Sequence, residues 1–202
     1  MEIDSAIEDM FKVGAHFAYS KSRRHPTAKP FIFGAKNRVE IFDLEKTKEQ
    51  LEKAKNFIRV IVRDGGQVLL VASKHEARDV IRDKAQSVEM PYVAGRWIGG
   101  TLTNFSEIKK RIDKLVDYLA KREKGEFGKY TKKERLLIDR EIENLRVLFS
   151  GLIPMKELPK VLFVVDSRKE HIAVTEAGKM GIPVVSLSSS DCDLTLVTYA
   201  IP

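Results

Sequence analysis

Short apolar runs alternate with amphipathic segments along this chain, and that alternation restricts its fold more than any other feature. Residues 68–72 are all apolar, and a run of this length is typical of a strand covered on both faces. Residues 47–62 carry apolar side chains at spacings of three and four, which predicts a helix ended by Gly65 and Gly66. We expect further strands at 38–44, 91–93, 161–166 and 183–187, and further helices at 74–87 and 170–179. Strand-helix alternation of this kind indicates a doubly wound parallel α/β sheet.

Residues 103–149 interrupt this rhythm and predict an inserted antiparallel, coiled-coil-like helical hairpin. Thr131 and Glu134 have the spacing of a capping box that starts the second helix. The two apolar seams consist of Ile108, Ile112, Leu115 and Leu119, and of Ile138, Ile142, Leu145 and Phe149. We therefore divide the chain into an α/β domain at 1–102 and 150–202, which includes a basic N-terminal loop at 12–38, and a hairpin at 103–149.

Composition excludes several classes of protein. No apolar run approaches the roughly 20 residues that a membrane-spanning helix needs, and the acidic residues Glu2 and Asp4 are unlike a signal peptide. Cys192 is the single cysteine, so no intramolecular disulfide can form. We expect a protein of the cytosol or of its organellar equivalent, with no membrane association.

Positive charge is concentrated near the N-terminus. The chain has a formal net charge of +7, and no carboxylate lies between Asp9 and Glu40. Residues 21–26 favour an irregular, exposed loop, so we predict contact with RNA phosphates here, against the alternative of an ordinary solvated surface. The seven cations of this interval are Lys12, Lys21, Arg23, Arg24, Lys29, Lys36 and Arg38.

Enzymatic function is the main alternative for an α/β chain, and the motifs do not favour it. The sequence contains neither a GxGxxG turn, nor a GxxxxGK[ST] loop, nor a GxSxG elbow. The four histidines are scattered, and Cys192 with His16 or His25 makes only a weak metal-binding set. Asp166 follows a predicted strand, where a cap for the next helix is a more common role than catalysis. We predict no catalytic residue, no metal site and no cofactor.

Residues 92–105 form the densest unusual stretch. They contain the single tryptophan, Trp97, beside Arg96 and the pair Gly99-Gly100. Trp97 either stacks on a base or anchors the hairpin to the sheet, and the anchoring role is favoured. For Arg96, phosphate contact and internal pairing are equally supported.

Several of these segments resemble the bacterial-type small-subunit ribosomal protein two family, in the family's order and over nearly the whole chain. They are Gly14-Ala15-His16-Phe17, Lys29-Pro30-Phe31-Ile32-Phe33-Gly34, Phe42-Asp43-Leu44-Glu45-Lys46-Thr47, Arg96-Trp97-Ile98-Gly99-Gly100-Thr101-Leu102-Thr103-Asn104-Phe105 and Gly181-Ile182-Pro183-Val184-Val185. The resemblance implies a flavodoxin-like domain with a protruding hairpin, bound to ribosomal RNA in the small subunit. It also implies neighbouring small-subunit proteins as partners, with the large OB-fold protein as one candidate, and no homo-oligomer.

The sequence therefore predicts a non-catalytic component of the small ribosomal subunit. An enzyme acting on a phosphorylated ligand and a free RNA-binding regulator are the two competing hypotheses. Candidate RNA-binding residues in the hairpin and before it are Arg96, Lys109, Lys110, Lys132 and Lys133, in addition to the seven N-terminal cations.

Overall fold

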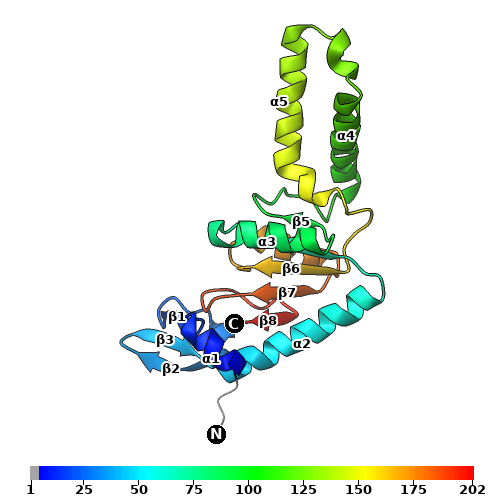
Figure 1. Cartoon of the computed structure of the whole chain (residues 1–202). Helices are drawn as coiled ribbons and strands as arrows, with labels where there is room; N and C mark the ends of the chain where they lie inside the picture. Colours follow the sequence, from blue (N-terminus) through cyan, green and yellow to red (C-terminus); the bar gives the residue numbers. More distant parts are fainter. Residues whose placement is uncertain (1–4) are drawn as a thin grey trace.

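A five-stranded parallel sheet forms the centre of the molecule, and a pair of helices projects from it (Figure 1). The computed structural model describes residues 5–202. The strand order is β5-β4-β6-β7-β8, with every neighbouring pair parallel. The chain moves outward from β4 in one direction and from β6 in the other, so the predicted doubly wound topology is confirmed. The strands are β4 (Val68–Val71), β5 (Tyr92–Val93), β6 (Val161–Val165), β7 (Val184–Leu187) and β8 (Tyr199–Ile201).

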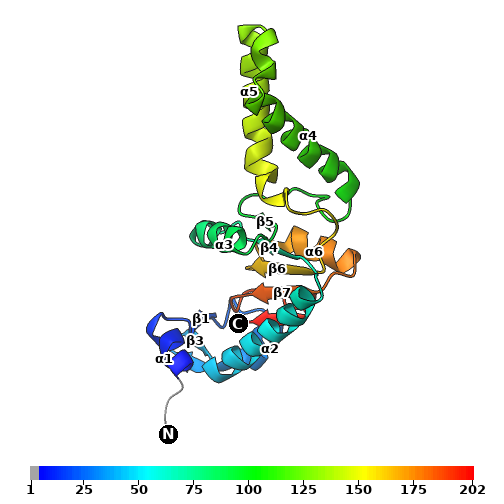
Figure 2. The same ribbon diagram turned by 45° about the vertical axis from the view of Figure 1, so that its right-hand side comes forward.

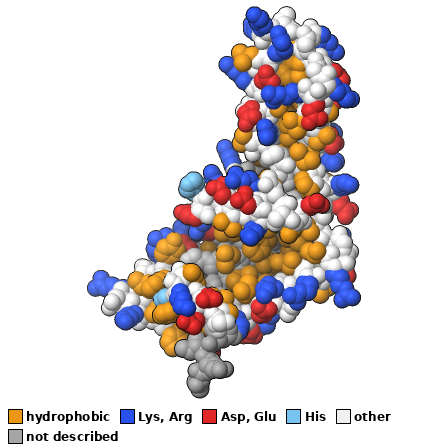
Figure 3. All heavy atoms as spheres, viewed as in Figure 1, with side chains coloured by type: hydrophobic (Ala, Val, Ile, Leu, Met, Phe, Trp, Pro, Cys, Tyr) orange, Lys and Arg blue, Asp and Glu red, His pale blue; other side chains and the backbone are white. Residues whose placement is uncertain are grey.

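Helices cover both faces of this sheet (Figure 2). The flanking helices are α2 (Leu44–Arg63), α3 (His75–Ser87) and α6 (His171–Lys179). Leu162 of β6 packs in the same cluster as Ala173 and Ala177 of α6, whereas Val161 packs in a separate cluster with Ala54 of α2. Successive residues of β6 therefore enter opposite cores, which explains why its sequence is an unbroken apolar run. Figure 3 shows apolar surface over the sheet between α2 and α3.

The N-terminal segment differs from the prediction. Residues 38–44 do not form a strand of the parallel sheet, because β3 (Val39–Phe42) pairs antiparallel with β1 (Phe17–Ser20) and β2 (Ile32–Lys36). Asn37 and Arg38 join β2 to β3 with φ values of 52° and 67°, the left-handed conformation of a tight hairpin turn. The prediction of a loop at 12–38 is thus wrong over much of that segment.

Two shorter elements complete this N-terminal layer, which we define as residues 5–43. Helix α1 (Ser5–Lys12) precedes β1, and the 3-10 turn η1 (Pro26–Phe31) leads into β2. Irregular backbone is retained at residues 21–25, where the charge cluster lies.

The inserted hairpin is confirmed as a helical pair. Helix α4 (Phe105–Glu123) is connected through the turn η2 (Glu126–Lys129) to α5 (Lys132–Phe149), and η3 (Ser150–Leu152) follows. The predicted capping box is present, with both of its hydrogen bonds, at the start of α5. The buried seam residues are Ile108, Ile112, Leu115, Ile142, Leu145 and Phe149, and they belong to the same apolar cluster as Leu69, Val71 and Val164 of the sheet.

Candidate nucleic-acid interface

The carboxyl ends of the strands, where open α/β sheets bind ligands, are occupied by the chain's own polar groups. Asp166, directly after β6, pairs with Lys74 at 2.6 Å and accepts hydrogen bonds from the backbone of Arg168 and Lys169. Its φ of 73° makes this turn tight. The residue at the start of α6 is Glu170, so the expectation that Asp166 caps that helix is wrong. Asp166 instead fixes the turn that leads into the helix.

Burial and hydrogen bonding act in opposite directions on these groups. Burial raises the pKa of Asp166. The Lys74 ammonium, the Lys169 N–H and the Cys192 thiol lower it by a larger amount, so the pKa is below its ordinary value. Burial raises the pKa of Cys192, whose Sγ lies 3.3 Å from Asp166 Oδ1. A buried thiol of raised pKa is a poor nucleophile.

The N-terminal layer closes the same edge. The backbone N–H of His25 donates to the carbonyl of Ser190 at 2.8 Å, and the N–H of Tyr19 donates to Ser190 Oγ at 2.9 Å. The N–H of Leu194 donates to Thr27 Oγ1 at 3.1 Å. The polar groups at this edge therefore hold the two layers together.

One buried carboxylate on helix α6 binds the connection that leads from β5 into the hairpin. Glu176 of α6 is only 7% exposed, and it accepts hydrogen bonds from Trp97 Nε1 at 3.1 Å, from the Gly100 N–H at 2.8 Å and from the Leu102 N–H at 3.0 Å. The N–H and hydroxyl of Thr103 also donate to it. Trp97 is therefore an anchor, the structural alternative of the two considered for it.

These donors determine the charge state of Glu176. Burial raises its pKa, but the hydrogen bonds from Gly100, Trp97, Thr103 and Leu102 together outweigh burial and hold the pKa below its ordinary value. A charged carboxylate thus fixes the connection from β5 to α4. No local sequence pattern distinguished Glu176 from an ordinary surface residue.

The N-terminal cations fall into two groups. Arg24 is largely buried and pairs with the buried Glu40 at 2.7 Å, and Lys12 pairs with Glu8 at 2.9 Å. Arg23 packs 4.1 Å above the Tyr19 ring and lies 3.6 Å from Asp191. The remaining four are exposed and have no ion pair within residues 5–202, namely Lys21, Lys29, Lys36 and Arg38.

The acid-free stretch is thus less positive in the fold than in the sequence. Glu40, Asp191 and Asp193 all come close to it, the last with its Oδ1 3.8 Å from His25 Nδ1. The absence of carboxylates from this stretch therefore does not leave Arg23 and Arg24 uncompensated, because tertiary structure brings Asp191 and Glu40 to them.

The hairpin cations differ in a similar way. Lys109 lies 3.5 Å from Asp113, and Lys110 lies 2.6 Å from Glu107, on α4 near the sheet. Lys132 and Lys133, at the other end of the hairpin, are exposed and form no ion pair with any described residue. Only the second pair presents uncompensated charge.

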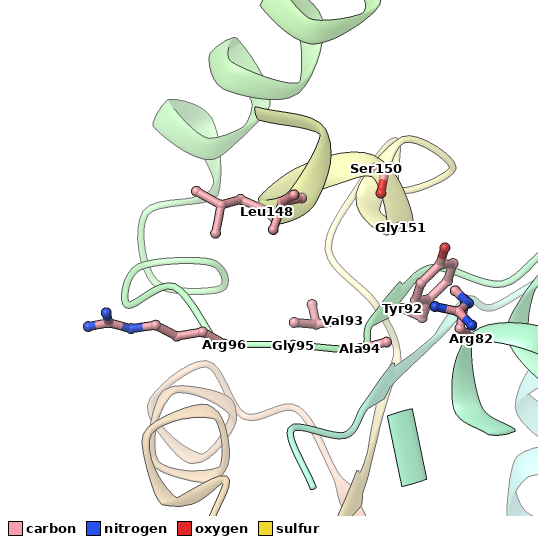
Figure 4. Close-up of a pocket in the computed structure, with 10 residues that line it drawn as sticks. Arg82, Tyr92, Val93, Ala94, Gly95, Arg96, Leu148, Ser150 and Gly151 are labelled. Atoms are coloured by element: carbon pink, nitrogen blue, oxygen red, sulfur yellow. The ribbon is translucent and has the colours of Figure 1, made fainter. Parts of the chain in front are cut away.

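Arg96 lies at the base of the hairpin beside a small hollow of about 210 Å³. In Figure 4 its side chain points away from Tyr92 of β5 and from Arg82 of α3, which lie on the opposite side of the view. Arg96 is exposed and has no ion pair in the part of the chain that the structure describes. Phosphate contact and internal pairing were the two alternatives for Arg96, and internal pairing is not observed.

Within residues 5–202, no group of three or more His, Cys, Asp or Glu side chains could hold a metal ion. None of the helices in this range combines the length and apolarity that crossing a membrane requires.

The fold and its surfaces define a basic α/β scaffold protein with an inserted helical hairpin. The family model of ribosomal protein S2 matches residues 10–202. The chain is 44% identical over 196 residues to small ribosomal subunit protein uS2 of Coprothermobacter proteolyticus, covering 97% of this chain and 73% of that protein. It is 44% identical to the uS2 protein of Roseiflexus castenholzii and 40% identical to that of Nitratiruptor sp., covering 96% and 97% of this chain and 73% of each relative.

The chain belongs to the ribosomal protein S2 family. It is accordingly a structural protein of the small ribosomal subunit and not an enzyme.

Proposed function

We propose that this protein binds ribosomal RNA through two exposed basic surfaces, one on the N-terminal layer and one on the hairpin, and so supports translation as part of the small subunit. The observation that carries the proposal is the set of exposed cations without carboxylate partners among the described residues. Uncompensated lysines and arginines attract phosphates, and their binding releases condensed counterions. Lys21, Lys29, Lys36 and Arg38 supply such charge on the N-terminal layer.

The candidate RNA-binding residues do not contribute equally. Arg24 is engaged with the buried Glu40, so its proposed role is to hold the N-terminal layer together, whereas Lys12 pairs with Glu8 within helix α1. Lys109 and Lys110 are likewise paired along α4. Arg96 keeps an exposed, unpaired guanidinium and remains a candidate for phosphate contact.

A neighbouring small-subunit protein is the second proposed partner. The N-terminal layer exposes apolar side chains, with Phe17 63%, Phe33 80% and Val39 39% exposed. A hollow of about 330 Å³ is lined by Phe17, Val39 and Ile41 together with Lys36 and Asn37. Grouped exposed apolar side chains favour a protein contact, and the large OB-fold protein implied by the family resemblance is our candidate. As a component of the small subunit, the protein would be found in the cytosol or in an organelle with its own ribosomes.

Sedimentation of a cell lysate tests the proposal. We expect a tagged chain to migrate with the small subunit at low salt and to be released as salt concentration increases, because phosphate contacts weaken with salt. A chain that stays at the top of the gradient at every salt concentration would contradict the proposal. A chain that comigrates with another complex would favour the free-regulator alternative.

A further inference from the structure

The N-terminal layer shares little apolar packing with the rest of the molecule. The two apolar clusters that fill the sheet and the hairpin include no residue of the range 5–43. The buried apolar side chains of the layer are those of Ala18, Ala28 and Phe42, two of which are small. Its larger apolar side chains include Phe17 and Phe33, and both are exposed. Because apolar burial is the main source of stability, the layer is held less firmly than the sheet.

Polar atoms inside the layer are incompletely paired. Arg24 and Glu40 form a buried ion pair through one atom of each group, Nη1 and Oε1, at 2.7 Å. Arg24 Nε, Glu40 Oε2 and His16 Nδ1 are buried and have no hydrogen-bond partner among residues 5–202. Gln67 Oε1 is the one other buried side-chain atom of this kind in the same range. A buried polar atom without a partner loses hydration on folding, so these three atoms favour opening of the layer.

Polar contacts with residues 190–194 hold the layer against the parallel sheet. Hydrogen bonds donated by the backbone N–H groups of Tyr19, His25 and Leu194 cross this boundary. The layer continues into α2 through Asp43, the N-cap of that helix. Figures 1 and 2 show the layer beside the start of α2 and to one side of the five-stranded sheet. The boundary can therefore open without disturbing the apolar core of the sheet.

One carboxylate links the two sides of the boundary electrostatically. The side chain of Asp191 is only 8% exposed, and its Oδ2 lies 2.5 Å from Arg168 Nη1 and 3.6 Å from Arg23 Nη2. Arg23 belongs to the layer and Arg168 lies outside it. Both arginine side chains are more than half exposed, so anions in solution can reach them while Asp191 occupies them. We call the contact of Asp191 with Arg23 the latch.

We propose that the N-terminal layer opens and closes as one unit, with Asp43 as the hinge, while the parallel sheet and the hairpin remain folded. A phosphate group binds Arg23 more readily after Asp191 has been released, so phosphates shift the equilibrium toward the open state. The layer therefore adjusts its position relative to the sheet when it meets a surface that carries phosphates. This inference goes beyond the proposed function, because it concerns the free chain and holds whichever partner the layer contacts.

Amide hydrogen exchange of the full-length chain tests the inference. Exchange is measured residue by residue by NMR under native conditions and at several low denaturant concentrations. Four reporting amides cover the boundary and the layer, namely those of Tyr19, His25, Leu194 and Phe42, each of which donates a hydrogen bond. The amide of Leu162 in β6 reports on the sheet.

We expect the four reporting amides to exchange at least about tenfold faster than the amide of Leu162, and with one common dependence on denaturant, because a single opening exposes them all. If they exchanged only as fast as Leu162, the layer would unfold only together with the sheet, and the inference would fail. Four unrelated rates that do not depend on denaturant would also overturn it, since local fraying has that signature.

Two variants of equal charge isolate the latch. Arg23→Gln removes the latch, whereas Arg168→Gln removes a contact between two residues outside the layer. We expect about threefold faster exchange of the reporting amides in Arg23→Gln, because a partly exposed ion pair has modest strength, and unchanged exchange in Arg168→Gln. The amide of Leu162 should exchange at one rate in both variants, which checks that the sheet is intact. Equal rates of the reporting amides in the two variants would contradict the assigned role of the latch.

Tripolyphosphate serves as the probe for phosphate groups. In the unaltered chain it should accelerate exchange of the reporting amides more than potassium chloride of equal ionic strength does, because it binds Arg23 in the open state. In Arg23→Gln the two salts should have equal effects. Slower exchange in tripolyphosphate would mean that phosphate binds the closed layer, and equal acceleration of the unaltered chain by both salts would mean that screening alone opens it. Either result would overturn the proposed response to phosphate.

Discussion

The base and the tip of the hairpin are formed by the same two helices, yet their side chains differ in burial and in the contacts they make. At the base, Leu115 is fully buried and Glu176 receives hydrogen bonds from the connection into α4. At the tip, residues 121–135, six of the seven cations are exposed and have no ion pair among the described residues, and the polar contacts include the capping box of α5 and the pair of Lys121 with Asp117. Stability is therefore concentrated where the hairpin meets the sheet, and the other end is free to carry unpaired charge.

The largest predicted contrast uses one type of substitution at two positions. Leu115→Ala should lower the free energy of unfolding by about 3 kcal/mol, because it opens a cavity in the core that the hairpin shares with the sheet. Leu137→Ala, at a position that is 55% exposed, should change it by less than about 0.5 kcal/mol. Denaturant unfolding of both variants checks this. Equal losses would show that burial in this shared core does not determine what a leucine of the hairpin contributes to stability.

A smaller loss is expected at the carboxylate that fastens the hairpin. Glu176→Gln should cost about 2 kcal/mol near neutral pH, because an amide cannot accept all of the hydrogen bonds now made to the charged group. Glu143→Gln, an exposed change on α5, is the matched control and should have little effect.

The stability lost in Glu176→Gln should depend on pH, because folding lowers the pKa of Glu176. The pKa of Glu176 in the folded protein lies below its ordinary value of 4.5. Its contribution to stability is thus fully present above that value and is lost as pH falls through the lower, folded-state pKa. The difference in unfolding free energy between the original chain and Glu176→Gln should shrink in acid. A difference that is constant with pH would mean that the charge of Glu176 does not hold the connection.

The smallest predicted effect is at the tip. Thr131→Ala removes the cap of α5 and should destabilise its first turn by about 1 kcal/mol. Amide exchange should become faster near Lys132 while protection around Leu115 is unchanged. Ser106→Ala, at an exposed position in the first turn of α4, is the control. Loss of protection at Leu115 in the Thr131 variant would mean that base and tip unfold together.

The central sheet could be predicted from the sequence because two-sided burial leaves a local signal. β4 and β6 are nearly continuous apolar runs, and the helix at α2 has clear three- and four-residue spacing. The antiparallel layer left a weaker signal, because β2 is exposed along most of its length. Its hairpin turn uses Asn37-Arg38 in place of the more recognisable Asn-Gly. β8 has three residues, too few to show a period.

For the candidate site, the sequence could identify the charged residues but not the residues that pair with them in the fold. The sequence identified Arg24 as a cation, but Glu40, its buried partner, is 16 positions away and reaches it through strand pairing. It identified Trp97 as unusual, but its acceptor, Glu176, lies 79 positions later. Which cations remain unpaired is decided by tertiary contacts, and local charge density does not contain that information.

Site-directed cleavage of RNA from single cysteines would test the two-surface account most directly. Cys192, the single native cysteine, is buried, and burial raises the pKa of its thiol, so a cysteine introduced elsewhere can be labelled selectively with a radical-generating iron chelate. Lys133→Cys at the tip, Lys29→Cys on the N-terminal layer and Glu143→Cys on the hairpin body would be assembled into small subunits. We predict strong cleavage of two different ribosomal RNA segments from the tip and the N-terminal layer, and weak cleavage from the body. Cleavage from Glu143→Cys as strong as that from Lys133→Cys, or cleavage of one shared segment from all three positions, would contradict the account.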